Sequence, residues 1–272
     1  MEKKIAVCLG LIMLCLTWGA PDVPEPPPHL AEAVVVLDLS TGTALAGANV
    51  TMRRQPGPLG QLATALAALD KLEERDWVVA SPEAASVSGT RRGLLPHQAL
   101  TAGALVRDML VHSANDAAWA LAEAAAGSVG EFVQLMNAKA AEIGLQHSRF
   151  TNPMGLDTRG QYSSALDLAK LAQAALAHPI LQGAASQQNF LWRFPGATGL
   201  KAGYSEEAGY CCLLSAQQNG IQLVVAVLGA RTENHLWLDA IRWLRFGFAH
   251  YESLLEKPMV ADINSNGPCA HP

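Results

Sequence analysis

The chain has 272 residues, half of them hydrophobic, and a formal net charge of −5. This length and apolar content are enough for one large domain with a sizeable core. The acidic balance argues against a nucleic-acid partner, which would require a basic face.

The N-terminal twenty residues have the pattern of a secretory signal. Lys3 and Lys4 precede an apolar run over 5–18, and small residues follow before Pro21. We therefore expect a signal peptide over 1–20, a proline-rich linker over 21–30 and export to the periplasm or cell envelope. The apolar run is short for a transmembrane helix, so we expect membrane contact only if this segment is retained.

The N-terminal half of the remaining chain predicts a hairpin followed by helices. Residues 34–39 and 44–46 are apolar stretches on either side of a glycine turn at Ser40–Thr43, which predicts a hairpin of two strands. The alanine- and leucine-rich stretch 59–74 predicts a buried helix with Pro58 in its first turn, where a missing N–H is harmless. Residues 81–97 have no regular pattern. Helices are expected over 101–111, 115–126 and 131–143, the last ending at Gly144.

The C-terminal half has the clearest patterns. Ser164 and Asp167 form a predicted capping box for a helix that ends before Pro179. Strands over 209–216 and 221–229 are joined by Asn219-Gly220, a strong hairpin signal. An amphipathic helix follows over 231–250. The predicted fold class is α/β (α+β), an antiparallel sheet flanked by helices beside a helical lobe. The domain is expected to span 31–255, with a loose tail over 256–272.

The pattern of cysteines and acidic residues predicts no metal site and no cofactor. Cys8 and Cys15 fall in the signal segment, which leaves Cys211, Cys212 and Cys269. Adjacent residues on a strand point to opposite faces, so Cys211 and Cys212 are expected to be buried thiols rather than a disulfide. The sequence contains no metal-binding spacing, Walker loop or dinucleotide-binding glycine run.

Four segments carry a family resemblance that covers about residues 33–251. The run 198–211 (TGLKAGYSEEAGYC) resembles a Lys-Thr-Gly strand motif with its following Ala-Gly-Tyr-Cys, and 113–118 (SANDAA) resembles a Ser-Gly-Asn-Asp-Ala segment. Residues 152–157 and 162–169 are also similar. In this order and spacing, the motifs resemble the serine D-alanyl-D-alanine carboxypeptidases, the low-molecular-weight penicillin-binding proteins. The resemblance implies a five-stranded antiparallel sheet beside a helical lobe, as in β-lactamases.

The resemblance also shows a departure at the first catalytic motif. Family members have Ser-x-x-Lys at the start of a buried helix, where residues three apart share a face and the lysine can take the serine proton. Here Pro58 stands at the serine and Gln61 at the lysine. Proline has no nucleophilic atom and no N–H for an oxyanion hole, and a glutamine amide is no base near neutral pH. We therefore expect a catalytically silent site.

The other two motifs are largely retained. The resemblance assigns catalytic positions to Ser113, Asn115 and Lys201 and substrate-binding positions to Ala202, Gly203 and Tyr204. Ala202 replaces a threonine whose hydroxyl, in the family, helps hold the substrate carboxylate. Weak binding of a peptidoglycan stem peptide or a β-lactam is thus the expected remnant of function.

Each of these residues also has a structural interpretation. Ser113 could be a helix N-cap with Asp116 three residues later, Asn115 a buried brace, and Lys201 a surface charge. Isolated histidines are expected to be structural or exposed, and tryptophans to be packing residues: His97, His112, His147, Trp192, Trp237 and Trp243.

Three functions remain open from the sequence. The first is a non-catalytic family member that binds cell-wall peptide or a protein partner in the envelope. The second is an active serine carboxypeptidase with rearranged residues, Ser113 as nucleophile and Lys201 as base. The third is a scaffold whose cleft has closed.

Overall fold

The fold was analysed in a computed structural model, which describes residues 24–261. The expected signal segment 1–20, the start of the linker and Cys269 lie outside the described residues. Within residues 24–261 no helix has the length and apolar character needed to cross a membrane.

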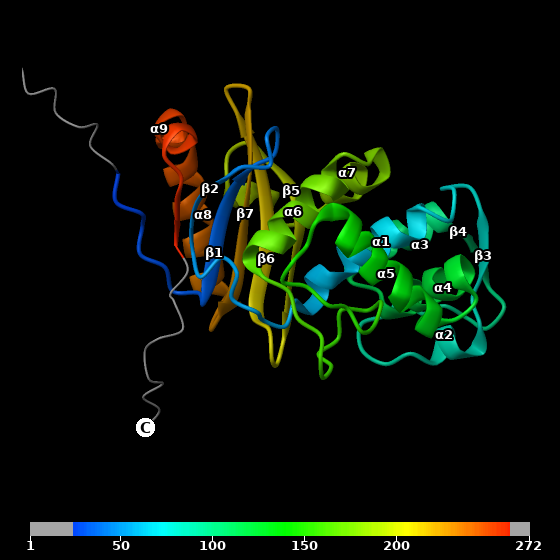
Figure 1. The fold of residues 1–272 in the computed structure, drawn as a ribbon. Helices are drawn as coiled ribbons and strands as arrows, with labels where there is room; N and C mark the ends of the chain where they lie inside the picture. The colour runs from blue at the N-terminus through cyan, green and yellow to red at the C-terminus, as the bar shows by residue number, and fades with distance from the viewer. Residues whose placement is uncertain (1–23, 262–272) are drawn as a thin grey trace, which may run out of the picture.

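A six-stranded sheet forms the centre of the molecule (Figure 1). Its strands, in spatial order, are β5 (Ala197–Ser205), β6 (Gly209–Gln218), β7 (Ile221–Ala230), β1 (Ala33–Asp38), β2 (Ala44–Ala48) and β8 (Met259–Ala261). The first five are antiparallel neighbours, and β8 pairs with β2 in parallel. The sheet is therefore one strand larger than the family resemblance implies. The segment expected to be a loose tail contains β8, whose three residues are ordered by pairing along the free edge of β2.

The tight β6–β7 connection agrees with the sequence prediction. Asn219 and Gly220 have φ values of 50° and 83°. Two successive residues with positive φ are characteristic of a type I′ turn, whose twist matches that of the strands it joins. This turn fixes the register of β6 against β7. Because successive side chains of a strand alternate between its faces, Cys211 and Cys212 of β6 lie in opposite cores. Both cysteines are buried and free.

Helices cover both faces of the sheet (Figure 1). On one face α8 (Glu233–Ala249) and α9 (Tyr251–Glu256) pack against Val34 and Val36 of β1. On the other face α6 (Ala165–Leu176) packs against Val35 and Leu37. The alternation of β1 side chains between the two cores follows from the period of two in a strand.

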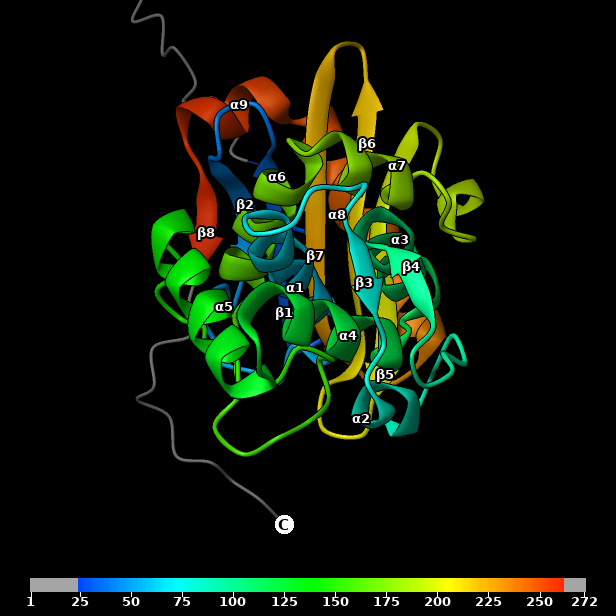
Figure 2. The same ribbon diagram turned by 90° about the vertical axis from the view of Figure 1, so that its right-hand side faces the viewer.

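The helical lobe lies beyond the α6 face. It contains a 3₁₀ turn η1 (Gly57–Gly60) and the helices α1 (Gln61–Leu69), α2 (Pro82–Ser86), α3 (Ala102–His112), α4 (Asn115–Ala126), α5 (Val129–Ile143) and α7 (Pro179–Ala185). A small ribbon of β3 (Trp77–Val79) and β4 (Ala99–Thr101) closes its far end (Figure 2). A second 3₁₀ turn, η2 (Leu191–Arg193), precedes β5.

Two predicted segments differ from the structure in this lobe. The first helix ends at Leu69 instead of 74, because the charged residues that follow form a turn in which Asp76 Oδ2 accepts a hydrogen bond from Glu73 N at 2.8 Å. The stretch expected to be irregular contains α2, which begins because the Ser81 side chain accepts a hydrogen bond from Ala84 N and Pro82 occupies the first turn.

Candidate active site

Pro58 lies in the 3₁₀ turn that leads into α1, directly beside β5. Gly57 adopts a φ of 52°, and this left-handed residue turns the chain so that the Pro58 ring faces β5. A Cβ atom built at Gly203 would lie 2.6 Å from Pro58 Cγ. The ring of Pro58 therefore packs against Gly203, a position of β5 that has no side chain.

Gln61 is the first residue of α1, and its side chain is buried beneath Pro58. Its Nε2 donates to Met154 O at 2.9 Å and lies 3.5 Å from both Ser113 O and Asn115 Oδ1. All of these neighbours are oxygens, so the orientation of the amide is determined by the network. The side chain of Gln61 therefore connects α1 to the start of α4 and to the loop that contains Met154.

Ser113 ends α3 and does not cap α4. Its φ of 54° is left-handed, and its N–H donates back to Asp108 O. The interpretation of Ser113 as a helix N-cap is therefore wrong. The carboxylate of Asp116 accepts hydrogen bonds from the N–H groups of residues 92–94 instead of closing a capping box. These bonds hold the preceding loop against α4.

Burial and hydrogen bonding act in opposite directions on Asp116. Burial alone would raise the pKa of this carboxyl, but hydrogen bonds from Leu94, Arg92, Gly93 and Ala117 N–H groups lower the pKa below its ordinary value. The ionised form is therefore the one that the fold stabilises.

Lys201 extends from β5 towards the helical lobe. It is 1% exposed, so its interpretation as a surface charge is wrong. Its Nζ donates to Ser113 Oγ and to Leu110 O, both at 2.9 Å, and lies 3.4 Å from Met109 O. Burial lowers the pKa of this amine to about 7. Near neutral pH, Lys201 is therefore shared between charged and neutral forms.

The residues singled out from the sequence meet at one place. Pro58 contacts Gly203, Lys201 bonds Ser113, and Gln61 lies beside Asn115. Asn115 also donates from Nδ2 to Ser88 O at 3.0 Å, which agrees with a bracing role. The prediction that Pro58, Ser113 and Lys201 converge between the sheet and the helical lobe is confirmed. Among the described residues no group of His, Cys, Asp or Glu could hold a metal ion.

Ala202 and Tyr204 belong to the other face of β5. Ala202 packs against the core under α8, and Tyr204 is exposed, with its ring centroid 4.7 Å from that of Tyr210. Cys211 lies below the turn, with its Sγ 3.6 Å from Pro56 O, and burial raises the pKa of its thiol to about 12. Cys211 is therefore an unreactive thiol under the site.

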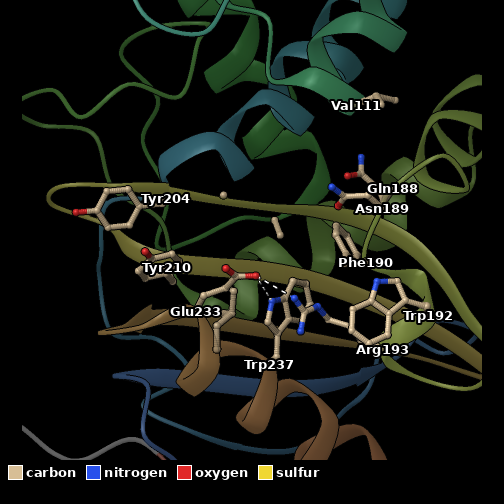
Figure 3. Close-up of a pocket in the computed structure, with 13 residues that line it drawn as sticks. Val111, Gln188, Asn189, Phe190, Trp192, Arg193, Tyr204, Tyr210, Glu233 and Trp237 are labelled. Atoms are coloured by element: carbon tan, nitrogen blue, oxygen red, sulfur yellow. Dashed lines mark hydrogen bonds and ion pairs between the residues drawn. The ribbon is translucent and has the colours of Figure 1, made fainter.

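A pocket of about 470 Å³ runs along the edge of β5 beside this site (Figure 3). Its lining comes from α3, the 188–193 segment, β5, β6 and the start of α8: Val111, Gln188, Asn189, Phe190, Trp192, Arg193, Ala202, Gly203, Tyr204, Tyr210, Glu233, Leu236 and Trp237. Trp237 and Trp243 are buried, as expected, but Trp192 is 77% exposed, so its interpretation as a packing residue is wrong. Sequence patterns missed this pocket because its residues come from distant segments.

Comparison with known proteins assigns the family. Residues 21–190 match the D-alanyl-D-alanine carboxypeptidase family. The chain is 31% identical to the D-alanyl-D-alanine carboxypeptidase DacB2 of Mycobacterium tuberculosis, over 85% of this chain and 86% of that protein. The chain belongs to the D-alanyl-D-alanine carboxypeptidase family.

Other members of this family, and their solved structures, are similar to the chain to a comparable degree. DacF of Bacillus subtilis is 32% identical over 83% of this chain. The crystal structure of a D-alanyl-D-alanine carboxypeptidase from Mycobacterium tuberculosis has 30% identity and a TM-score of 0.80, covering 84% of this chain and 95% of that one. The crystal structure of penicillin-binding protein 6B from Escherichia coli has 28% sequence identity and a TM-score of 0.79, and the match covers 85% of this chain and 81% of that one. The chain spans 64% of the length of DacF.

Proposed function

We propose that this protein is a non-catalytic member of the D-alanyl-D-alanine carboxypeptidase family that binds peptidoglycan stem peptides at the cleft beside β5. The observation that carries the proposal is the contact of Pro58 with Gly203. The family resemblance assigns the nucleophile position to Pro58, whose ring has neither a hydroxyl nor an N–H.

The base position supports the same proposal. Gln61 Nε2 lies beside Asn115 Oδ1 and Met154 O, so the amide fills the space from which a lysine would act. A glutamine amide cannot accept a proton near neutral pH, so the three-residue spacing from Pro58 no longer serves proton transfer. Loss of one oxyanion donor alone costs on the order of 10²–10³ in rate.

Lys201 and the edge of β5 support retained binding of a peptide. β5 is an edge strand with one side unpaired by other strands, so an extended peptide can pair with it. Lys201 provides positive charge beneath this edge when protonated, and a terminal carboxylate is its natural counter-charge. Since the pKa of Lys201 is about 7, peptide affinity should be higher at pH 6 than at pH 8.

We further propose that the protein acts in the periplasm or cell envelope. The support is the basic start and apolar run over residues 1–20, together with membership of a family whose substrates are cell-wall peptides.

One observation favours a second candidate, an active serine enzyme with rearranged residues. Lys201 Nζ is 2.9 Å from Ser113 Oγ, and its pKa of about 7 leaves part of it as a free amine. In such a mechanism Lys201 takes the hydroxyl proton while Ser113 Oγ bonds the acyl carbon to form an ester. The C–N bond to the terminal D-alanine breaks, and Lys201 gives the proton to the departing amine.

Two measurements separate these functions. Incubation with a fluorescent penicillin, followed by intact-mass analysis, should show no added mass. An adduct located on Ser113 would establish the second candidate and overturn the first. Titration of a D-Ala-D-Ala tripeptide at pH 6 and pH 8 should show binding that weakens at the higher pH and loses this dependence in Lys201→Met. Absence of binding at both pH values would favour a closed scaffold.

A further inference from the structure

The pocket beside β5 is built by aromatic rings held in fixed positions. Arg193 lies over two rings, 4.8 Å from the Trp192 centroid and 4.7 Å from that of Trp237. Glu233 Oε1 accepts hydrogen bonds from Arg193 and from Trp237 Nε1, both at 3.0 Å. The Phe190 ring contacts Trp237 at a centroid distance of 5.0 Å, with the two ring planes tilted by 38°. The floor of the pocket is therefore organised before any ligand arrives.

Exposed rings stand at the two ends of this floor. Trp192 is 77% exposed and Tyr204 is 54% exposed, although both are large aromatic side chains. Figure 3 shows them at opposite ends of the pocket, with Tyr210 and Trp237 between them. The amide side chains of Gln188 and Asn189 border the same space. Aromatic residues at the rim and amides beside them can give a ligand both stacking area and hydrogen bonds.

The charge of the lining restricts the class of ligand. Its only charged side chains are Arg193 and Glu233, and they pair with each other. Neither a free cation for an anionic ligand nor a free anion for a cationic ligand is left among the thirteen lining residues. An uncharged ring with apolar C–H faces and polar edges can stack on the aromatic side chains and form hydrogen bonds with the amides.

We propose that this pocket binds an uncharged amino-sugar unit of a glycan strand, next to the cleft that takes the stem peptide. The inference rests on the proposed function, since the pocket shares Ala202 and Gly203 with the peptide-binding edge of β5. The sugar face stacks on Trp192, and its acetamido and hydroxyl groups bond the amides of Gln188 and Asn189. Peptide and glycan recognition would then lie on adjoining surfaces.

The test is calorimetric titration of the full-length protein with a tetramer of N-acetylglucosamine, beside a D-Ala-D-Ala tripeptide. Trp192→Ala should weaken tetramer binding by about tenfold or more, because aromatic anchors carry most of the affinity at such sites. Trp77→Ala is the matched control, since Trp77 is 72% exposed on β3, which lies at the far end of the helical lobe from β5 (Figure 1). It should leave tetramer binding unchanged. Neither variant should change tripeptide binding.

The outcomes distinguish the two proposals. Tripeptide binding without tetramer binding overturns the glycan inference and leaves the proposed function in place. Tetramer binding that Trp192→Ala does not weaken also overturns the inference, because the sugar then binds elsewhere. Tetramer binding without tripeptide binding supports the glycan pocket and contradicts the peptide-binding function. If an uncharged aromatic peptide binds in a Trp192-dependent manner and the tetramer does not, the pocket is a polypeptide site.

Discussion

The Pro58 ring lies so close to Gly203 that a side chain at residue 203 would have its Cβ 2.6 Å from Pro58 Cγ and 2.8 Å from Pro58 Cβ. Such distances are shorter than normal carbon–carbon contacts, so the turn before α1 and the strand β5 fit together only because one of them has no side chain. This contact joins Pro58, the position that the family resemblance assigns to the nucleophile, to the strand that carries Lys201 and Gly203.

The first prediction concerns this contact. Gly203→Ala should lower the free energy of unfolding by about 1–3 kcal/mol, the usual cost of overpacking. Denaturant unfolding measures this change in the free energy of unfolding. Pro58→Ala in the same background should recover part of the loss by removing the nearest carbon. Gly183→Ala is the control, because nothing lies within 4 Å of a Cβ there. Equal stability of Gly203→Ala and the natural protein would show that the turn moves away freely.

The second prediction concerns repair of catalysis. Pro58→Ser combined with Gln61→Lys should restore slow acylation by a reactive β-lactam, since Ser113, Asn115 and Lys201 already meet at this place. Each single change should recover far less, because nucleophile and base act as a unit. Removing the proline should cost a few tenths to about 1 kcal/mol of stability. Mass spectrometry follows the acylation, and a folded but inert double variant would mean that the cleft geometry has changed.

The repaired protein allows one further step at β5. Ala202→Thr, added to the double variant, should improve peptide turnover by returning a hydroxyl to the position where the family resemblance places a carboxylate donor. Release of D-alanine, measured with and without this third change, is the direct readout. An unchanged rate would argue against a carboxylate-binding role for residue 202.

The third prediction uses the pKa of Lys201. Its value of about 7 in the folded protein is below the ordinary 10.5, so between these values the unfolded chain binds more protons and stability rises with pH. The free-energy cost of burying the charged amine is therefore fully present below about pH 7 and decreases as the pH rises. The stability of the natural protein relative to Lys201→Met should therefore increase between pH 7 and about 9.5 in urea unfolding.

The control for this experiment is Lys139→Met. Salt bridges with Asp70 and Glu142 at 2.6 and 2.9 Å raise the pKa of Lys139, despite an opposing effect of burial. The stabilising contribution of Lys139 is complete below pH 10.5, the ordinary pKa of a lysine, and is lost only above that pH. The stability difference for Lys139→Met should be flat over the same range, and a matching slope would exclude Lys201 as the cause.

The fourth prediction concerns the loop that Asp116 holds. Asp116→Asn should destabilise the protein by about 2–3 kcal/mol, because hydrogen bonds to a buried charged acceptor are strong and the amide cannot accept all of them. Since the pKa of Asp116 is lowered in the folded protein, its contribution is present above the ordinary value of 3.8 and is lost as the pH falls through the folded value. Asp70→Asn, at an exposed ion pair, should cost less than about 1 kcal/mol.

Local sequence signals predicted much of the fold. Asn219-Gly220 predicts the β6–β7 hairpin because two positive φ angles are needed there, and α4 lies over 115–126 as its alanine-rich pattern indicates. The order of the motifs around Ser113 and Lys201 was enough to predict the family and the convergence of these residues. The hairpin turn and the helix are encoded by neighbouring residues, whereas the convergence of Ser113 and Lys201 was predicted from the family resemblance.

Other features were decided by tertiary packing. β8 is three residues long and forms only because β2 offers a free edge, and the side chain of Ser113 meets Lys201, 88 residues further along the chain, only in the fold. Arg193 and Glu233 lie 40 residues apart and meet only in the fold, and Trp192 beside them is 77% exposed. Contacts between distant segments leave no periodic signal along the chain. Sequence therefore determined which residues carry the site, and the tertiary structure determined which of them are buried, charged or exposed.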